Sequence, residues 1–380
     1  MFLIFTGAAV LATLALFARQ AMLVAYILLG IILGPWGVAL VNDPGLVQDI
    51  STIGIIFLLF LLGLDLLPKQ LVKMLGEALP TTIFSALIFW GAGFGIGMAF
   101  SLNTHESVLV GVSLMFSSTI IGVKLMPTTS LHHRHTGQMI ISVLLLQDLL
   151  AILVLLLLQG YGKGVNLVTD ILMQLGMLPV LIAVSWLLYR YVLEKLILRF
   201  DQIHEYIFLV AIAWCLGISQ LAAAMGLSRE IGAFIAGITL ASSPIALFIT
   251  EKLKPLRDFF LVLFFFSLGA GFNMGALDRI LLPALLLAAF AIVIKPLVFR
   301  QLFVWVGEKP SVSLEVGFRL GQISEFSLLI AVLAVQSRYI SDAASYLIQL
   351  ATLLTFIVSS YVIVLRYPTP IAVSDRLRRD

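Results

Sequence analysis

The sequence is poor in charged residues, and this scarcity excludes most water-soluble folds. Lys, Arg, Asp and Glu make up 11% of the chain, whereas hydrophobic residues make up 61%. Soluble domains carry about 25% charged residues, because their surface must face water. A surface with so little charge must face lipid instead, so we expect an integral membrane protein.

The sequence has a single cysteine and no pattern of residues typical of a metal site or a catalytic site. The only cysteine, Cys215, lies in an apolar run and cannot form a disulfide within the chain. No Cys/His spacing predicts a zinc site, and no nucleophile–base pair is visible. The glycines of Gly91–Gly97 mimic a phosphate-binding loop, but they lie inside an apolar run and predict close helix packing. We expect no enzyme, no cofactor and no nucleic-acid partner.

Long apolar runs fill the chain instead. A membrane-spanning helix needs about 20 residues, and continuous rather than alternating runs favour helices over strands. The predicted architecture is an all-α polytopic membrane protein with thirteen transmembrane helices surrounded by lipid. The predicted spans are 2–17, 21–41, 50–64, 80–100, 106–126, 138–160, 168–189, 203–225, 228–249, 256–273, 277–303, 312–335 and 343–366.

The distribution of basic residues sets the orientation. If the N-terminus lies outside, most Lys and Arg fall in cytoplasmic regions, including Arg190, Lys195 and Arg199 after the seventh span. The opposite side holds Lys163, Arg229, Arg279 and Arg338, while Lys295 and Arg319 stay within spans. The sequence therefore predicts an outside N-terminus and a cytoplasmic C-terminus.

Gln147 and Asp148 lie near the middle of the sixth predicted span. An ionisable group at this depth costs at least about 2.5–3.5 kcal/mol, so it needs a function or a partner. A single carboxylate that binds either a cation or a proton, but not both at once, is sufficient for cation/proton exchange. The alternative is a neutral or paired carboxyl that holds two helices together.

Lys295 lies in the eleventh predicted span, directly before Pro296. The proline removes a helix hydrogen bond and frees a backbone carbonyl. A buried lysine needs a hydrogen-bond or charge partner, and Asp148, an acidic residue within another predicted span, is a candidate. The alternative is a lysine that extends toward the cytoplasmic end of its span.

Two further spans carry matched polar clusters at their middle. The fifth contains Ser117, Ser118 and Thr119, and the twelfth contains Gly321, Gln322, Ser324 and Glu325. Aligned on Val110-Gly and Val316-Gly, Ser118 falls opposite Ser324 and Thr119 opposite Glu325. The second of these spans comes seven helices after the first, and because seven is odd the two spans enter the membrane from opposite sides. This pattern predicts an inverted repeat with two interrupted helices whose carbonyls and hydroxyls bind a cation; hydroxyls that bond back to their own helix are the alternative.

Short motifs along nearly the whole chain resemble the cation:proton antiporter superfamily, in particular the Kef-type potassium/proton antiporters. They include Gly34-Pro-Trp-Gly37, Gly54–Asp65, Phe116–Thr119, Leu146-Gln-Asp-Leu149, Gly232–Gly237 and Gly321–Phe326. The resemblance implies a sodium/proton antiporter-like fold over 1–366, with inverted repeats near 1–160 and 203–366. It also implies a dimerisation and a mobile core subdomain, a homodimer, and a place in the bacterial inner membrane.

The resemblance also assigns roles. Asp148 matches the ion-binding aspartate of the family, and a glutamine before it, here Gln147, is typical of potassium proteins. Gln147, through its side-chain carbonyl, and Ser117, Ser118 and Thr119 would supply oxygen ligands, and Gln322, Ser324, Glu325 and Lys295 would balance charge where the broken helices cross. In dual-aspartate members the matching lysine pairs with the first acid, a pair that Gln147 cannot form. The partner of Lys295 thus stays open.

The predicted activity is electroneutral exchange of K⁺ for H⁺ by alternating access at Asp148. The alternatives are sodium/proton exchange on the same fold and a gated potassium efflux channel, although no Thr-Val-Gly-Tyr-Gly filter is present. Kef-type proteins usually continue into a cytosolic nucleotide-binding regulatory domain. This sequence contains none, and residues 367–380 resemble the start of a linker to one.

Overall fold

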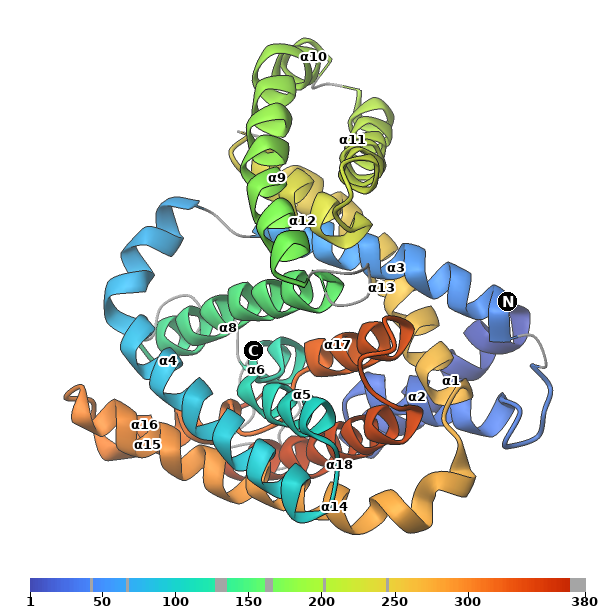
Figure 1. Cartoon of the computed structure of the whole chain (residues 1–380), viewed down its shortest axis with the longest axis vertical. Helices are drawn as coiled ribbons and strands as arrows, with labels where there is room; N and C mark the ends of the chain where they lie inside the picture. The colour runs from blue at the N-terminus through green and yellow to red at the C-terminus, as the bar shows by residue number, and fades with distance from the viewer. Residues whose placement is uncertain are drawn as a thin grey trace. The chain divides into compact units, whose positions relative to one another are not determined.

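The computed structural model describes residues 1–41, 44–65, 68–126, 135–160, 167–200, 203–243 and 246–369. Throughout those ranges the regular elements are helices, as the apolar runs predict (Figure 1). In the first part of the chain they are α1 (Phe2–Phe17), α2 (Met22–Leu33), α3 (Pro44–Asp65), α4 (Pro68–Ala99), α5 (Thr104–Met115), α6 (Thr119–Lys124) and α8 (His135–Gly160).

The second part of the chain is also helical. Its elements are α9 (Leu167–Leu188), the π-helix η1 (Tyr189–Leu193), α10 (Glu194–Arg199), α11 (His204–Ala224), α12 (Arg229–Ala241), α13 (Ala246–Ala270), the 3₁₀ turn η2 (Met274–Ala276), α14 (Leu277–Ala289), the π-helix η3 (Phe290–Ile294), α15 (Lys295–Trp305), α16 (Pro310–Arg319), α17 (Glu325–Gln336) and α18 (Asp342–Arg366).

Among the described residues, seven helical stretches are long and apolar enough to cross a membrane. They are Ala78–Ala99, Thr104–Gly122, Thr136–Leu155, Gly176–Arg199, Glu205–Ala224, Met274–Trp305 and Asp342–Arg366. The expectation of a polytopic membrane protein is confirmed. Each of the thirteen predicted segments contains a helix, but thirteen spans exceed the seven helices that meet the criteria of length and composition, so the number stays a prediction.

Several boundaries of the predicted spans are wrong: α2 ends at Leu33 rather than near residue 41, and the helix of the seventh span continues through η1 and α10 to Arg199 rather than ending near residue 189. A further difference concerns α12. The segment 228–249 was expected to be continuous, yet α12 ends at Ala241 and α13 begins at Ala246, ten residues before the predicted start at 256. Pro244 disfavours helix in the residue before it. The charged residues that suggested a loop lie on α13 instead, where Lys254 pairs with Glu251 and Arg257 pairs with Asp258.

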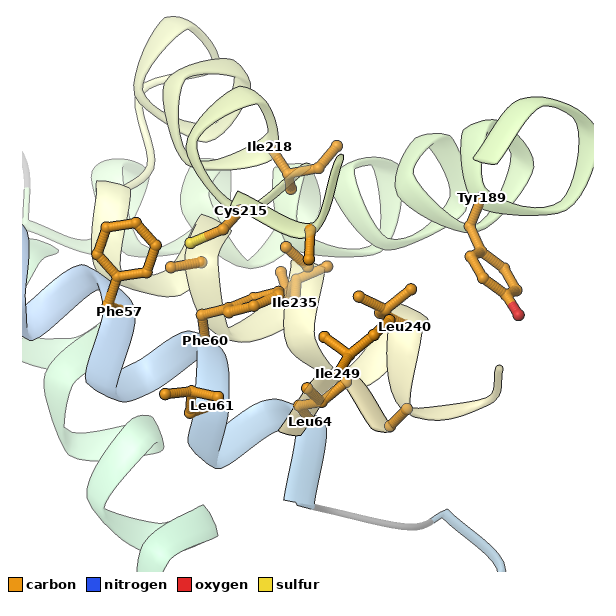
Figure 2. Close-up of a cluster of buried hydrophobic side chains, with 14 of the residues drawn as sticks. Phe57, Phe60, Leu61, Leu64, Tyr189, Cys215, Ile218, Ile235, Leu240 and Ile249 are labelled. Atoms are coloured by element: carbon orange, nitrogen blue, oxygen red, sulfur yellow. The ribbon is translucent and has the colours of Figure 1, made fainter. Parts of the chain in front are cut away.

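The chain divides into two compact units. The first comprises Met1–Phe5, Leu29–Val72 and Leu156–Gly271. Its core lies where α3, α11, α12 and α13 bring buried side chains together (Figure 2). A Cβ on Gly63 would lie 2.3 Å from the Phe234 carbonyl, so α3 and α12 pack backbone to backbone. Cys215 is fully buried in this core, where it packs as a small apolar side chain.

The second unit comprises Thr6–Leu28, Lys73–Leu155 and Phe272–Asp380. Within it α5 packs against α17 and α18, and α15 packs against α16. Two of the glycines of Gly91–Gly97 contact α5, because a Cβ on Gly93 or Gly97 would lie within 3 Å of Gly111 or Ser107. This confirms helix packing as the role of that motif. All the polar residues singled out within the spans belong to this unit.

Candidate functional site

Two helices of the second unit are interrupted at their polar clusters. α5 ends at Met115 and α6 begins at Thr119; α16 ends at Arg319 and α17 begins at Glu325. Within each break the backbone leaves helical geometry, as at the C-cap Phe116 and the N-cap Ser324. Interrupted helices expose carbonyl and N–H groups that must find partners in an apolar surrounding.

The two breaks have the same local design. Ser118 and Ser324 each precede the second half-helix, and their hydroxyls accept hydrogen bonds from the amides of Ile121 and Phe326. Thr119 and Glu325 are then the first helical residues. The pairs that the sequence alignment placed opposite each other therefore occupy equivalent positions, each serine as a helix N-cap.

Direct hydrogen bonds join one break to the other. The Ser117 hydroxyl donates to the Leu320 carbonyl over 2.7 Å, and Gln322 Nε2 donates to the Ser118 carbonyl over 3.3 Å. Nearby, the Ser327 hydroxyl donates to the Ser113 carbonyl over 2.7 Å. The Ser117 and Ser327 hydroxyls thus bond across the two helices, whereas those of Ser118 and Ser324 cap their own half-helices. Together with Gln322, the cross-helix bonds join the two breaks into one centre.

Lys295 binds carbonyls of both breaks. Its Nζ donates to the Phe116 carbonyl over 3.0 Å and to the Gln322 carbonyl over 3.1 Å, and it lies 5.0 Å from the centre of the Phe89 ring. The side chain is fully buried, so it does not extend to the end of its span. Across the described ranges it forms no salt bridge, and the suggested pair with Asp148 is wrong.

The backbone before Lys295 explains its position. Pro296 cannot donate the usual helix hydrogen bond, and the turn before it, η3, is a π-helix. A Cβ on Gly317 would lie 2.4 Å from the Pro296 carbonyl, so α16 passes very close to this distorted turn. The lysine thereby reaches the break that follows α16.

Gln147 supports the first break. Its Oε1 accepts the Ser117 N–H over 2.9 Å, while its buried Nε2 has no partner among the described residues. The carbonyl that was expected to bind a cation is thus engaged by the backbone. The hydroxyls of Ser117 and Ser118 are engaged in the same way.

Three oxygen-bearing groups remain with unused acceptors. Asp148 is 2% exposed, and within the described part of the chain no hydrogen bond reaches its carboxylate. Glu325 interacts electrostatically with Asp148; its Oε1 accepts the Ile120 N–H, whereas its Oε2 has no partner in that part of the chain. The buried Thr119 Oγ1 is unpaired there too. Buried oxygens of this kind are suitable ligands for an alkali cation or a proton.

Side chains of α18, which the sequence did not indicate, also bind the second break. The Thr355 hydroxyl accepts the Ile323 N–H over 3.1 Å, and the Ser359 hydroxyl donates to Gln322 Oε1 over 3.1 Å. Both side chains are buried and complete the hydrogen bonding of the second break. The signal that could have revealed them is the recurrence of Ser345, Thr352, Thr355 and Ser359 along one face of an apolar helix.

The comparison with known families rests on almost the whole chain. A family model described as "Sodium/hydrogen exchanger, transmembrane" matches residues 3–365. The chain belongs to this family. The resemblance to cation:proton antiporters that the motifs suggested is therefore confirmed, and the chain is a multi-pass membrane protein.

Two relatives of this chain come from Arabidopsis thaliana. K(+) efflux antiporter 4 is 31% identical over 349 residues, and K(+) efflux antiporter 6 is 30% identical over the same length. Both alignments cover 88% of this chain but only 58% and 57% of the relatives. The chain thus spans less than two thirds of the length of these relatives.

A solved structure shows the same fold. It is the sodium proton antiporter MjNhaP1 from Methanocaldococcus jannaschii, which is 20% identical. The superposition covers 94% of each chain with a TM-score of 0.69. At this identity the likeness establishes the fold alone.

Proposed function

We propose that the chain exchanges K⁺ for H⁺ across a membrane and that both ions bind, alternately, at Asp148. The observation that carries the proposal is the buried Asp148 carboxylate, which accepts no hydrogen bond within the described ranges. Asp148 and Thr119 are the ligands with free oxygens, and Glu325 supplies a third. Gln147, Ser117 and Ser118 shape the site, because their polar atoms bind the broken backbone.

The charges around the crossing support a one-to-one exchange. If they are ionised, Asp148 and Glu325 contribute two negative charges and Lys295 contributes one positive charge, which leaves one unbalanced negative charge. Either one monovalent cation or one proton neutralises it. A buried site is stable in the membrane only when its charge is balanced, so the site crosses in either loaded state but not empty.

The proposed cycle moves one unit of the chain. The second unit contains the crossing and would act as the mobile core, and the first unit would hold the dimer contact. The equivalent Ser118 and Ser324 caps support an inverted repeat in the thirteen-span topology. The protein would be a homodimer in a bacterial inner membrane, with the N-terminus outside and the C-terminus in the cytoplasm.

Sodium is the second candidate ion. The names of the two plant relatives favour potassium, whereas the matching fold is that of a sodium proton antiporter. Because Lys295 offsets one of the two carboxylates, the site carries a single unbalanced negative charge, which suits a larger, more weakly hydrated cation and favours potassium. Proton movement recorded with K⁺, Na⁺, Rb⁺ and Li⁺ in turn separates the two candidates.

The test uses purified protein in liposomes that contain a pH-sensitive dye. A K⁺ pulse is expected to drive proton movement in the wild type, and Asp148→Asn is expected to abolish it, because the remaining charges already balance. Asp278→Asn, which removes an exposed carboxylate from α14, is the matched control and should retain exchange. Unchanged exchange by Asp148→Asn would contradict the proposal.

A further inference from the structure

Arg319 is a second buried cation in the spans, and the proposed exchange does not use it. It is the last residue of α16 and is 1% exposed. Its Nε donates to Glu315 Oε1 over 3.0 Å, Nη1 donates to the Leu125 carbonyl over 3.2 Å, and Nη2 donates to the Pro368 carbonyl over 2.9 Å. All three nitrogens of the guanidinium are therefore bonded.

The carbonyls that Arg319 binds lie at the C-terminal ends of helices. Leu125 follows directly after α6, and Pro368 lies two residues after the end of α18. Helix C-termini carry unpaired carbonyls and partial negative charge, which a cation stabilises. The planar guanidinium can serve several acceptors at once, which a lysine ammonium cannot do with the same geometry. One side chain thus joins the ends of α6, α16 and α18.

The chain that leaves α18 packs around the same point. The Tyr367 ring lies 6.0 Å from the Phe318 ring and 5.7 Å from the Arg319 guanidinium. The Arg366 guanidinium lies 5.4 Å from the Phe318 ring, and Thr369 is fully buried. Residues 366–369 are therefore held against the last turn of α16.

The short helix α6 links Arg319 to the ion site. It has six residues, too few for a helix to be stable without contacts at its ends. At its N-terminal end the Ser118 hydroxyl and the Glu325 carboxylate accept backbone N–H groups. At its C-terminal end the neighbouring carbonyl of Leu125 binds Arg319, and a Cβ on Gly122 would lie 3.3 Å from the Arg319 carbonyl.

We propose that Arg319 is a positioning residue for the ion site. Its guanidinium joins α6 and residues 366–369 to α16 and so keeps Thr119 and Ile120 in place beside Glu325. This inference rests on the proposed cation exchange for its transport readout. Its structural content, the attachment of residues 366–369 by Arg319, has a separate readout that does not depend on the transported ion.

The transport test compares Arg319→Lys and Arg319→Ala with the wild type in liposomes. Arg319→Lys retains the positive charge but loses the planar guanidinium that serves several acceptors at once, so the apparent KM for K⁺ is expected to rise about three- to tenfold. Arg319→Ala is expected to raise it further and to displace the pH profile. Arg300→Lys, on the exposed face of α15, is the matched control and should keep the wild-type KM.

The second test measures whether residues 366–369 stay attached. In a Cys215→Ala background, Thr369→Cys carries a single thiol at a buried position, and its rate of reaction with a maleimide reports exposure. The rate is expected to be slow with Arg319 and to rise at least about tenfold in Arg319→Ala, with Arg319→Lys between the two. Arg300→Lys should leave the rate unchanged.

The outcomes separate the two proposals. Raised KM together with faster labelling supports the positioning role of Arg319. Wild-type KM and wild-type labelling in Arg319→Lys overturn it, and this variant decides the matter even if Arg319→Ala does not fold. If the wild type shows no exchange, or if Asp148→Asn exchanges normally, the proposed function fails, while the labelling still tests the attachment.

Discussion

At the scale of single residues, the site at the two helix breaks depends on which hydrogen-bond partner each buried polar group has. Lys295 provides an ammonium to two carbonyls that the broken helices leave unpaired. Gln147 provides a carbonyl to an N–H of the first break. Asp148 differs from both, because no hydrogen bond reaches its carboxylate within the described part of the chain. The groups that build the site are bonded, and the group that would bind the ion keeps its acceptors free.

Lys295 gives a prediction about stability. Lys295→Met is expected to lower the free energy of unfolding by about 3–5 kcal/mol, because it leaves two buried carbonyls and the negative charge of the site without their cation. The midpoint of thermal unfolding in detergent measures the loss. Lys309→Met removes an exposed lysine at the start of α16 and serves as the control. Equal unfolding midpoints for the two variants would show that the carbonyls find other partners.

At the scale of elements, close backbone contacts set the position of the charged side chains. α16 reaches the distorted turn at Pro296 only because Gly317 has no side chain. The π-helix η3 and the proline direct Lys295 toward the break after α16. Each helix break therefore depends on the packing of a neighbouring helix as much as on its own sequence.

Gly317→Ala tests this contact. The added Cβ would lie 2.4 Å from the Pro296 carbonyl, so α15 and α16 must separate, and a loss of about 1–3 kcal/mol in unfolding free energy is expected. Proton movement driven by K⁺ should fall in parallel, because Lys295 shifts away from Gln322. In the control Gly91→Ala no atom lies within 4 Å of the new Cβ, so stability should stay the same or rise. Wild-type stability and exchange in Gly317→Ala would contradict this role.

At the scale of the whole molecule, the balance of buried charges predicts how the proposed exchange responds to the membrane potential. One negative charge remains when Lys295, Asp148 and Glu325 are counted together, and either ion balances it. A neutral loaded site crosses without moving net charge, so an imposed potential should not change the exchange rate. Liposomes with a potential set by a lipophilic anion gradient measure this. Faster exchange at one sign of the potential would show that the stoichiometry is not one to one.

Much of the fold could be predicted because it depends on local composition. Apolar runs must form helices in lipid, so each predicted segment contains one. The end of α12 at Ala241 and the start of α13 at Ala246 could not be predicted. The charged residues of α13 have low hydropathy, and by hydropathy alone they indicate a loop. The equivalence of Ser118 and Ser324 was visible in the sequence, since both serines serve the same local purpose at a helix start.

The sequence by itself determined that the chain is a helical membrane protein, that two polar clusters interrupt their helices, and that a carboxylate, Asp148, stands within an apolar run. Those properties follow from residue type and spacing along the chain. Only the tertiary structure decided that Lys295 binds two carbonyls rather than Asp148, that Gln147 is engaged by Ser117, and that Arg319 joins three helix ends. These partners lie far apart in sequence. Which buried donor meets which acceptor depends on packing geometry that residue order alone does not contain.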